Sequence, residues 1–280
     1  MNENAAITTC SISKYFGDFR AIRDLSISVP QGEIFGFIGK NGAGKTTFMR
    51  IICGLMKPSS GKLEVRTPVS FLPQNVRFCD NMNAEEILRF FGRLRNCDSA
   101  KSEKFAKELE IDLSKKITNL SPGQQRKLQL VIATIGLPDI LILDEPTAGL
   151  DPSGVQQVRG IIKILNQRGC TIFISSHVLI ELENLCHTVA IIEKGVLLYQ
   201  GACSSFYEIE TERLDRKIIE LLSETKKKSF EVIGDLLIAG IERYEVPFVL
   251  NFLHEKNVKV FSVRRQGIET LYNRIIKEVT

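Results

Sequence analysis

The sequence lacks the features that mark secreted, membrane-spanning or zinc-binding proteins. No apolar run approaches the ~20 residues that a helix needs to cross a bilayer, and the start, Met1–Asn4, is too polar for a signal peptide. The seven cysteines are scattered without a Cys-x-x-Cys pair, and the three histidines do not flank paired cysteines. These absences indicate reduced cytosolic thiols and argue against a zinc site.

The length and net charge of the chain place only loose limits on the number of domains and the kind of partner. A chain of 280 residues suits one large domain or two smaller ones, and hydrophobic and charged fractions of 44% and 25% are ordinary for a globular protein. The net charge of +4 is mild, so no nucleic-acid partner is expected. If the protein works at a membrane, it must dock onto a partner there.

One glycine-rich stretch, Gly39–Thr47, has the context of a phosphate-binding loop. It follows the apolar run Ile34–Ile38, an expected buried strand, and precedes Phe48–Ile52, an expected helix. Glycines let the backbone wrap closely, so that N–H groups and the positive helix end converge on an anion. We expect Lys45 to reach the outer phosphates and Thr46 to ligate Mg²⁺. The strand–helix context favours this reading over a glycine-rich turn that binds nothing.

Strands and helices alternate over most of the chain, which predicts a mixed, mostly parallel, doubly wound α/β sheet. Residues 5–12 are expected to form an edge strand, and residues 25–29 one half-buried strand. Residues 75–136 are mostly helical and form an inserted helical subdomain. In its helix over 83–95, Ile87, Phe91 and Leu94 are expected on one face beside Leu88. Four consecutive aliphatic residues, 140–143, predict a strand covered on both faces.

The character of the chain changes after residue 202. Residues 208–222 are charged and amphipathic and are interpreted as a helix or linker, and the lysines at 226–228 as a solvated surface. Residues 230–280 predict strand, strand, helix, strand, helix. The expected organisation is an ATPase domain over residues 1–205 and, over residues 206–280, a linker helix with a small α+β domain.

Three polar side chains follow buried strands where the phosphate loop should also lie. Asp144 and Glu145 end one such strand, and strand ends of a parallel sheet share one edge. Asp144 can hold Mg²⁺ and Glu145 can polarise an attacking water, although an Asp-Glu pair alone could be a helix cap. His177 follows the next buried strand, where a role at the γ-phosphate competes with a structural one. Ser121-Pro122 predicts a helix start, which is either ordinary capping or a second anion-attracting helix end.

Together these motifs resemble, in order and spacing, an ATP-binding cassette (ABC) subunit over roughly residues 5–205. The resemblance implies a P-loop NTPase with a RecA-like mixed sheet flanked by helices, an antiparallel β subdomain and the inserted helical subdomain. Its implied cofactors are ATP and Mg²⁺. The nucleotide-binding positions that it implies are Phe16 (with Tyr15 as the alternative base-stacking residue), Gly39, Asn41, Gly42, Ala43, Gly44, Lys45, Thr46, Thr47, Ser121, Gly123, Gln124 and Asp151.

The resemblance also implies catalytic and metal roles. Glu145 looks like the catalytic base, His177 like the switch histidine, and Gln74 like the Q-loop residue that touches Mg²⁺ and the nucleophilic water; Thr46, Gln74 and Asp144 are the implied metal positions. The chain departs from the family at Pro122, which replaces a glycine and lacks an N–H, and at His187, where an aspartate is common.

What the family implies about assembly follows from these motifs. The segment Leu120–Gln124 of one subunit faces the phosphate loop of a second subunit, so a homodimer sandwiches two ATP molecules, and residues 75–115 dock a separate membrane permease. The subunit then lies at the cytoplasmic face of the membrane, bound through the permease. The tail after residue 202 resembles that of bacitracin, daunorubicin and lantibiotic-immunity exporters, so export is expected. An importer subunit, a soluble ABC protein of ribosomes or DNA repair, and an ATP-gated regulatory module are the alternatives.

Overall fold

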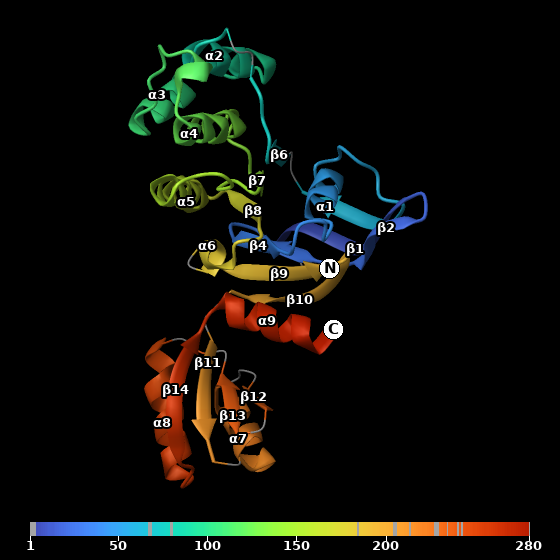
Figure 1. Ribbon diagram of the computed structural model, residues 1–280, viewed down its shortest axis with the longest axis vertical. Helices are drawn as coiled ribbons and strands as arrows, with labels where there is room; N and C mark the ends of the chain where they lie inside the picture. The colour runs from blue at the N-terminus through green and yellow to red at the C-terminus, as the bar shows by residue number, and fades with distance from the viewer. Residues whose placement is uncertain are drawn as a thin grey trace. The chain divides into compact units, whose positions relative to one another are not determined.

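The contacts within the chain divide it into two compact units (Figure 1). The first unit comprises Met1–His177 with Leu185–Gly201, and the second unit comprises Val178–Asn184 with Ala202–Thr280. The computed structural model describes residues 4–66, 69–78, 81–183, 185–203, 206–212, 214–226, 230–233, 235–239, 241 and 243–279.

A six-stranded sheet forms the centre of the first unit. Its strand order is β10-β9-β4-β8-β7-β6, and the β4–β8, β4–β9, β6–β7 and β7–β8 pairs are parallel. Its members are β4 (Ile34–Ile38), β6 (Val69–Leu72), β7 (Ile140–Asp144), β8 (Thr171–Ser176), β9 (Thr188–Glu193) and β10 (Val196–Ala202). Every residue of β4, β7 and β8 is buried, as expected for strands covered on both faces. The predicted mixed α/β sheet is confirmed.

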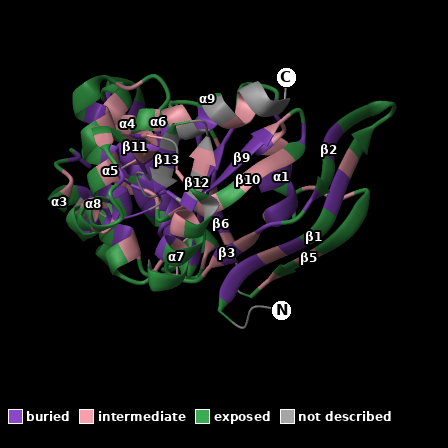
Figure 2. Cartoon of the chain, turned by 90° about the horizontal axis from the view of Figure 1, so that it is seen from below, coloured by how far each residue is buried: buried purple, intermediate pink, exposed green. Residues whose placement is uncertain are grey.

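An antiparallel sheet lies beside the parallel one, and it corrects two predictions. Strand β1 (Ala5–Phe16) pairs with β2 (Phe19–Leu25), β3 (Ser28–Pro30) and β5 (Ser60–Val65), so β1 is a central strand and not an edge strand. The half-buried strand expected at residues 25–29 is divided between β2 and β3. Backbone irregularities along β1 shift the pairing, which is why its burial alternates unevenly (Figure 2).

Helix α1 (Lys45–Ile52) packs its apolar side against both sheets. Phe48 lies 5.2 Å from Phe37 of β4 and 6.4 Å from Phe173 of β8, measured between ring centroids. All three rings are fully buried. Burying a phenylalanine contributes about 1.5–3 kcal/mol, so this cluster fixes the position of the helix that follows the phosphate loop.

Helices α2 (Ala84–Leu94), α3 (Ala100–Glu108) and α4 (Pro122–Ala133) are inserted between β6 and β7 and gather at one end of the first unit (Figure 1). Asn83 and Ser121 begin α2 and α4 with capping boxes, as helix starts of this sequence type predict. The predicted apolar face of α2 is partly wrong. Ile87 and Leu88 are buried and Phe91 is half-buried, but Leu94, the last residue of α2, is 67% exposed.

The second unit contains a four-stranded antiparallel sheet in the order β12-β13-β11-β14. Its elements follow one another as β-α-β-β-α-β, the ferredoxin-like arrangement, and the short α6 and terminal α9 pack on each other beside it. The elements are α6 (Leu179–Glu183), β11 (Phe206–Thr211), α7 (Arg216–Lys226), β12 (Phe230–Ile233), β13 (Leu236–Ala239), α8 (Val246–Glu255), β14 (Val260–Gln266) and α9 (Ile268–Val279).

The helix or linker predicted over 208–222 is wrong at its start, because residues 208–211 belong to strand β11 and helix α7 begins only at Arg216. Tyr207, Ile209 and Thr211 are buried and alternate with Glu208 and Glu210, so a period of two decides the structure. The strand–strand–helix–strand–helix order expected over 230–280 is confirmed. The predicted solvated lysines at 227 and 228 lie outside the described residues.

Candidate active site

The glycine-rich stretch connects β4 to α1 and takes a shape that requires glycine. Gly42 and Gly44 have φ angles of 81° and 107°, in the left-handed region. A Cβ on Gly44 would lie 2.7 Å from the carbonyl oxygen of Ala21, and one on Gly39 would lie 2.7 Å from that of Ile192. The loop therefore packs so closely against neighbouring backbone that Gly39 and Gly44 have no room for a Cβ. Its backbone leads into the N-terminus of α1.

Lys45, the first residue of α1, is only 6% exposed and turns back over the loop. Its Nζ donates to the carbonyl oxygens of Gly39 at 2.7 Å and Lys40 at 3.3 Å. The same Nζ lies 3.2 Å from Oε1 of Glu145. The ammonium therefore sits between the loop that should receive phosphate and the carboxylate expected to be the base.

Asp144 is fixed by two hydroxyl groups at the end of β7. Oγ1 of Thr46 donates to its Oδ2 at 2.8 Å, and Oγ of Ser175 donates to its Oδ1 at 2.7 Å. Ser175 also accepts the backbone N–H of Glu145 at 3.0 Å. The parallel register of β7 and β8 pairs Asp144 with Ser175, so the sheet itself places this hydroxyl. Sequence reasoning missed Ser175, although the alignment of the two predicted strands could have revealed it.

Glu145 is buried between two cationic or polarisable groups. The residue is 5% exposed and takes a φ of 47°, which is uncommon for a side chain other than glycine. Its Oε2 lies 2.8 Å from Nδ1 of His177. Among the described residues its Oε1 accepts no hydrogen bond, and Nζ of Lys45 at 3.2 Å forms an ion pair with it instead. This ion pair supplies the compensating charge that a buried carboxylate needs.

Arg126 of α4 ties the inserted helices to the strand ends of the sheet. Its Nε donates to the carbonyl oxygen of Pro146 at 2.7 Å, and its Nη2 to those of Asp144 at 3.3 Å and Glu145 at 3.0 Å. Its Nη1 donates to the carbonyl of Gln74 at 3.3 Å. Burial lowers the pKa of Arg126 to about 10, partly offset by the charge of Asp144. Sequence reasoning missed this residue.

The Gln74 side chain itself is exposed, and among the described residues it forms no hydrogen bond with Asp144 or Glu145. Only its backbone carbonyl is fixed, by Arg126. The structure therefore brings Lys45, Thr46, Asp144, Glu145 and His177 together, while the Gln74 side chain forms no hydrogen bond with them among the described residues.

The residues of the second implied nucleotide surface line a separate hollow of about 720 Å³. Ser121, Gly123, Gln124 and Asp151 all border it, and no residue of Gly39–Thr47 does. Oγ of Ser121 accepts the N–H of Gln124 at 3.2 Å, and Oδ1 of Asp151 accepts the N–H of Gly154 at 3.0 Å. One chain thus presents Leu120–Gln124, the signature segment, and its phosphate loop, Gly39–Thr47, as two separate surfaces.

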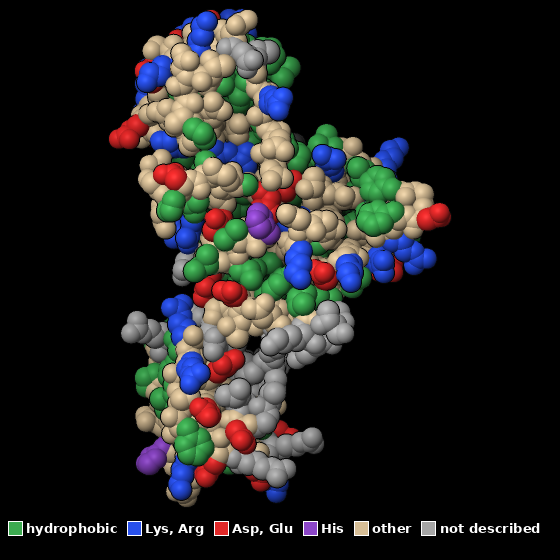
Figure 3. Space-filling model, in the orientation of Figure 1, with side chains coloured by type: hydrophobic (Ala, Val, Ile, Leu, Met, Phe, Trp, Pro, Cys, Tyr) green, Lys and Arg blue, Asp and Glu red, His purple; other side chains and the backbone are tan. Residues whose placement is uncertain are grey.

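The remaining implied positions surround the loop. Asn41 is exposed, Thr47 is half-buried, and the buried Ala43 accepts the N–H of Gly195 at 2.9 Å through its carbonyl. Phe16 is 47% exposed at the end of β1, and Nζ of Lys14 lies 5.3 Å from its ring centroid. Hydrophobic side chains gather over β1 and β2 with cationic side chains around them (Figure 3).

Tyr15 is 41% exposed, and Arg20 lies 5.7 Å from its ring. Exposure alone therefore does not separate Tyr15 from Phe16. His187 has a structural role, because its Nδ1 accepts the N–H of Ile34 at 2.9 Å and so holds the start of β4.

The donor set fits a magnesium nucleotide. Thr46 and Asp144 place a hydroxyl and a carboxylate oxygen 2.8 Å apart, and Mg²⁺ prefers oxygen ligands supplied by one or two protein groups together with phosphate. The glycine backbone and Lys45 lie on the adjoining loop, where a polyphosphate would meet N–H groups and a cation. Thr46 and Asp144 are the residues that would hold the metal.

Comparison with known proteins identifies the same family from several directions. The model of the ABC transporter family matches residues 22–148. An uncharacterized ABC transporter ATP-binding protein of Methanocaldococcus jannaschii is 39% identical over 200 residues, covering 68% of this chain and 75% of that protein. The ABC transporter ATP-binding protein NatA of Bacillus subtilis is 34% identical, covering 73% and 92%. The bacitracin transport ATP-binding protein BcrA of Bacillus licheniformis is 36% identical, covering 69% and 68%.

Solved structures agree with the fold. The ATP-binding subunit of an ABC transporter superposes with a TM-score of 0.63 at 26% identity, covering 70% of this chain and 90% of that one. None of the helices in the described part of the chain combines the length and apolar character needed to cross a bilayer. The phosphate loop, the strand-end carboxylates and these relatives lead to one conclusion. The chain belongs to the ABC transporter ATP-binding proteins.

Proposed function

We propose that this chain is the ATP-hydrolysing subunit of an exporter, which drives a separate membrane permease by ATP-dependent dimerisation. Some relatives are named for what they transport, among them the bacitracin transport protein described above and a Nod factor export ATP-binding protein of Paraburkholderia xenovorans that is 33% identical over 225 residues. The observation that carries the hydrolytic part of the proposal is the buried Glu145 carboxylate, held between Lys45 and His177 beside the Thr46–Asp144 pair.

In this proposal Glu145 is the general base. Its carboxylate takes a proton from the attacking water, and His177, 2.8 Å away, orients it. Lys45 leaves Glu145 when a triphosphate enters, because three phosphate charges offer the ammonium a stronger partner than one carboxylate. Phosphoryl transfer depends on positioning and charge neutralisation, and bound Mg²⁺ supplies part of that neutralisation.

A second copy of the chain completes the site in this proposal. Ser121 and Gly123 border a hollow that contains no phosphate-loop residue, so the chain that contributes them needs another chain to contribute Lys45. The N-termini of α1 and α4 both attract anions. In the proposed dimer, the N-terminus of α1 from one chain and that of α4 from the other face the same triphosphate. Pro122 removes one N–H from this contact, so we expect a weaker clamp than with glycine.

The permease is expected to dock on the inserted helices, within residues 75–115. Phe90 and Leu94 of α2 are 53% and 67% exposed, and the Phe90 ring packs edge-on against Phe91 at 5.3 Å. Exposed apolar side chains on one helix mark a protein contact better than the polar faces beside them. Such a contact places the chain at the cytoplasmic face of the membrane.

Glu145→Gln tests the proposed chemistry. The variant should bind Mg·ATP with a Kd within threefold of the parent and lose turnover by at least a hundredfold, because an amide cannot accept the proton. Glu64→Gln, on the exposed face of β5, is the matched control and should hydrolyse ATP at the parental rate. Turnover by Glu145→Gln at the parental rate would overturn the assignment of the base.

A further inference from the structure

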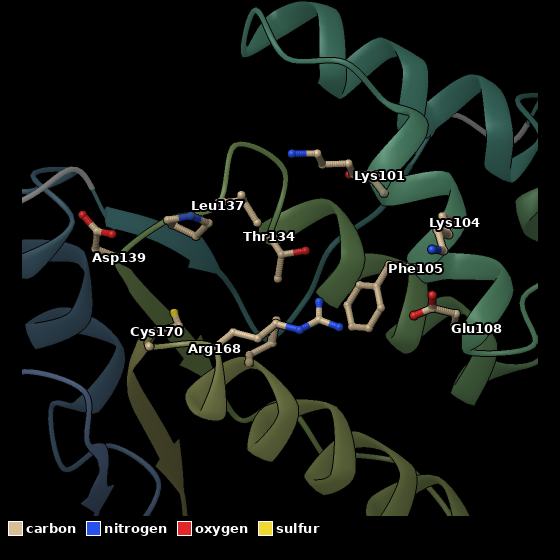
Figure 4. A pocket seen from close by; sticks show the side chains of 13 residues that line it. Lys101, Lys104, Phe105, Glu108, Thr134, Leu137, Asp139, Arg168 and Cys170 are labelled. Atoms are coloured by element: carbon tan, nitrogen blue, oxygen red, sulfur yellow. The ribbon is translucent and has the colours of Figure 1, made fainter.

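A second cavity lies in the first unit at the junction of the inserted helices with α5 (Pro152–Gln167), and none of the residues implied in nucleotide binding lines it. Its volume is about 510 Å³, within the range of about 300–1,000 Å³ that is usual for small-molecule sites. Figure 4 shows side chains from α3, from the segment after α4 and from the end of α5 converging on it.

The floor of this cavity is apolar and aromatic. Phe105 of α3 and Leu165 of α5 are 8% and 6% exposed, and both line it. The guanidinium of Arg168 lies 5.1 Å from the Phe105 ring centroid, so a cation rests on the ring face (Figure 4). An aromatic or aliphatic group that enters the cavity would therefore displace water from an apolar wall, and the charge of Arg168 would lie at the rim of that wall.

Three cations border the cavity: Lys101, Lys104 and Arg168. In the described part of the chain, no carboxylate forms an ion pair with any of them. Two acidic residues, Glu108 and Asp139, also line the cavity, and Figure 4 shows Asp139 at the end remote from Phe105. Cations outnumber carboxylates by three to two, and one of the cations, Arg168, lies over the aromatic ring, with Lys104 and Glu108 beside Phe105 (Figure 4).

Leu137, at the mouth, has features that packing does not explain. It is 69% exposed and takes a φ of 51°, a left-handed conformation that costs a leucine free energy. Strained backbone and an exposed large apolar side chain both occur preferentially where a ligand is held. Leu137 contributes apolar surface to the lining of the cavity.

We propose that this cavity binds a small amphipathic anion, with an aromatic or medium-chain aliphatic body and a carboxylate or sulfonate head. The body lies on Phe105 and Leu165 under Leu137, and the head is held by Lys101, Lys104 and Arg168. Because α3 belongs to the inserted helices and Arg168 follows α5, an occupant that contacts both resists their relative movement. It should then slow ATP turnover, a consequence that rests on the proposed hydrolysis, whereas binding itself does not.

The test uses the full chain and the fluorescent probe 1-anilinonaphthalene-8-sulfonate. Decanoate should displace the probe, whereas inorganic phosphate and Mg·ATP should not. The double variant Lys101→Ala/Lys104→Ala should raise the probe's Kd at least tenfold. Lys107→Ala, on the exposed side of the same helix and outside the cavity, should change it less than twofold.

A second pair of variants guards against misfolding. Leu137→Asp and Leu137→Asn both suit a left-handed, exposed position better than leucine does, so both should fold. They differ by one negative charge at the mouth, so the aspartate variant should bind the probe at least fivefold more weakly than the asparagine variant. Equal binding by the lysine double variant and the parent, displacement of the probe by Mg·ATP, or equal affinity of the two Leu137 variants overturns the proposal.

Discussion

Arg126 donates through Nε to the carbonyl oxygen of Pro146 at 2.7 Å, and this contact joins α4, which begins within Leu120–Gln124, to the segment that follows β7 and carries Glu145. Arg126 is 7% exposed, and among the described residues its guanidinium donates to backbone carbonyls and to Oε1 of Gln129. The planar guanidinium presents several N–H donors in a fixed arrangement that can reach all of these carbonyls, whereas a lysine ammonium could reach only some of them. The position of Glu145 thus depends on a residue of the inserted helices.

Arg126→Lys should therefore lower ATP turnover at least tenfold while changing the Kd for ATP less than threefold. The buried carbonyls that lose their donor should also destabilise the fold by about 2–3 kcal/mol, since each unsatisfied group costs about 1–3 kcal/mol. Turnover, nucleotide titration and urea denaturation measure the three effects. Arg93→Lys on the exposed side of α2 is the control, and similar turnover in both variants would contradict a positioning role.

Because Lys45 and Glu145 form a buried ion pair, removing both charges should destabilise the protein less than removing the lysine alone. Lys45→Ala leaves the buried Glu145 carboxylate without its cation and should cost about 3 kcal/mol of unfolding free energy in the absence of nucleotide. Lys45→Ala/Glu145→Gln should regain most of that loss, because the amide carries no charge. A double-mutant cycle by urea denaturation measures the coupling. Additive effects of the two substitutions would show that the ion pair contributes nothing.

The base-stacking roles of Phe16 and Tyr15 can be distinguished by measuring the binding of ATP and of inorganic triphosphate, which lacks the adenine base. Phe16→Ala should raise the Kd for ATP by about fivefold to thirtyfold, as stacking on a base is worth about 1–2 kcal/mol, and should leave the Kd for inorganic triphosphate unchanged. Tyr15→Ala should have a smaller effect on ATP. A larger effect of Tyr15→Ala would assign the stacking role to Tyr15 instead.

Alkaline pH should destabilise the protein through its buried thiols. Burial, with a smaller contribution from the charge of Asp144, raises the pKa of Cys53 from 9.0 to about 12, so the folded state keeps a proton that the unfolded chain loses. This stabilisation is complete below pH 9 and is lost as the pH rises from 9 toward 12.

The free energy of unfolding should accordingly fall between pH 8 and pH 10.5, and by less in Cys53→Ala than in the parent. Urea denaturation at the two pH values measures the difference, and Cys10→Ala, at an exposed position, is the control. An equal fall in the parent and in Cys53→Ala would contradict a contribution from this thiol.

Much of the site could be predicted because its chemistry is local in the sequence. The glycines, Lys45 and Thr46 are contiguous, and the aliphatic run before Asp144 and Glu145 indicates a strand by composition alone. Helix starts at Asn83 and Ser121 were also predictable, since a cap and its glutamate or glutamine partner lie three residues apart.

The features that escaped prediction depend on distant partners. Ser175 matters only because β8 aligns it with Asp144, and Arg126 only because α4 packs over residues 144–146. The central position of β1 follows from pairing with β5, about fifty residues away along the chain. Residues 208–211 of strand β11 were predicted as the start of a helix or linker because the stretch is charged, although Tyr207, Ile209 and Thr211 alternate with its glutamates.

The central claim, that one nucleotide site is shared by two copies of the chain, is tested most directly by mixing two inactive variants. Glu145→Gln lacks the base, and Ser121→Arg blocks the signature surface, so neither should hydrolyse ATP alone. A mixed dimer would contain one site with an intact Glu145 from one chain and an intact Ser121 from the other. We predict that the mixture recovers ATPase activity in steady-state phosphate release, and a mixture no more active than its separate components would contradict the account.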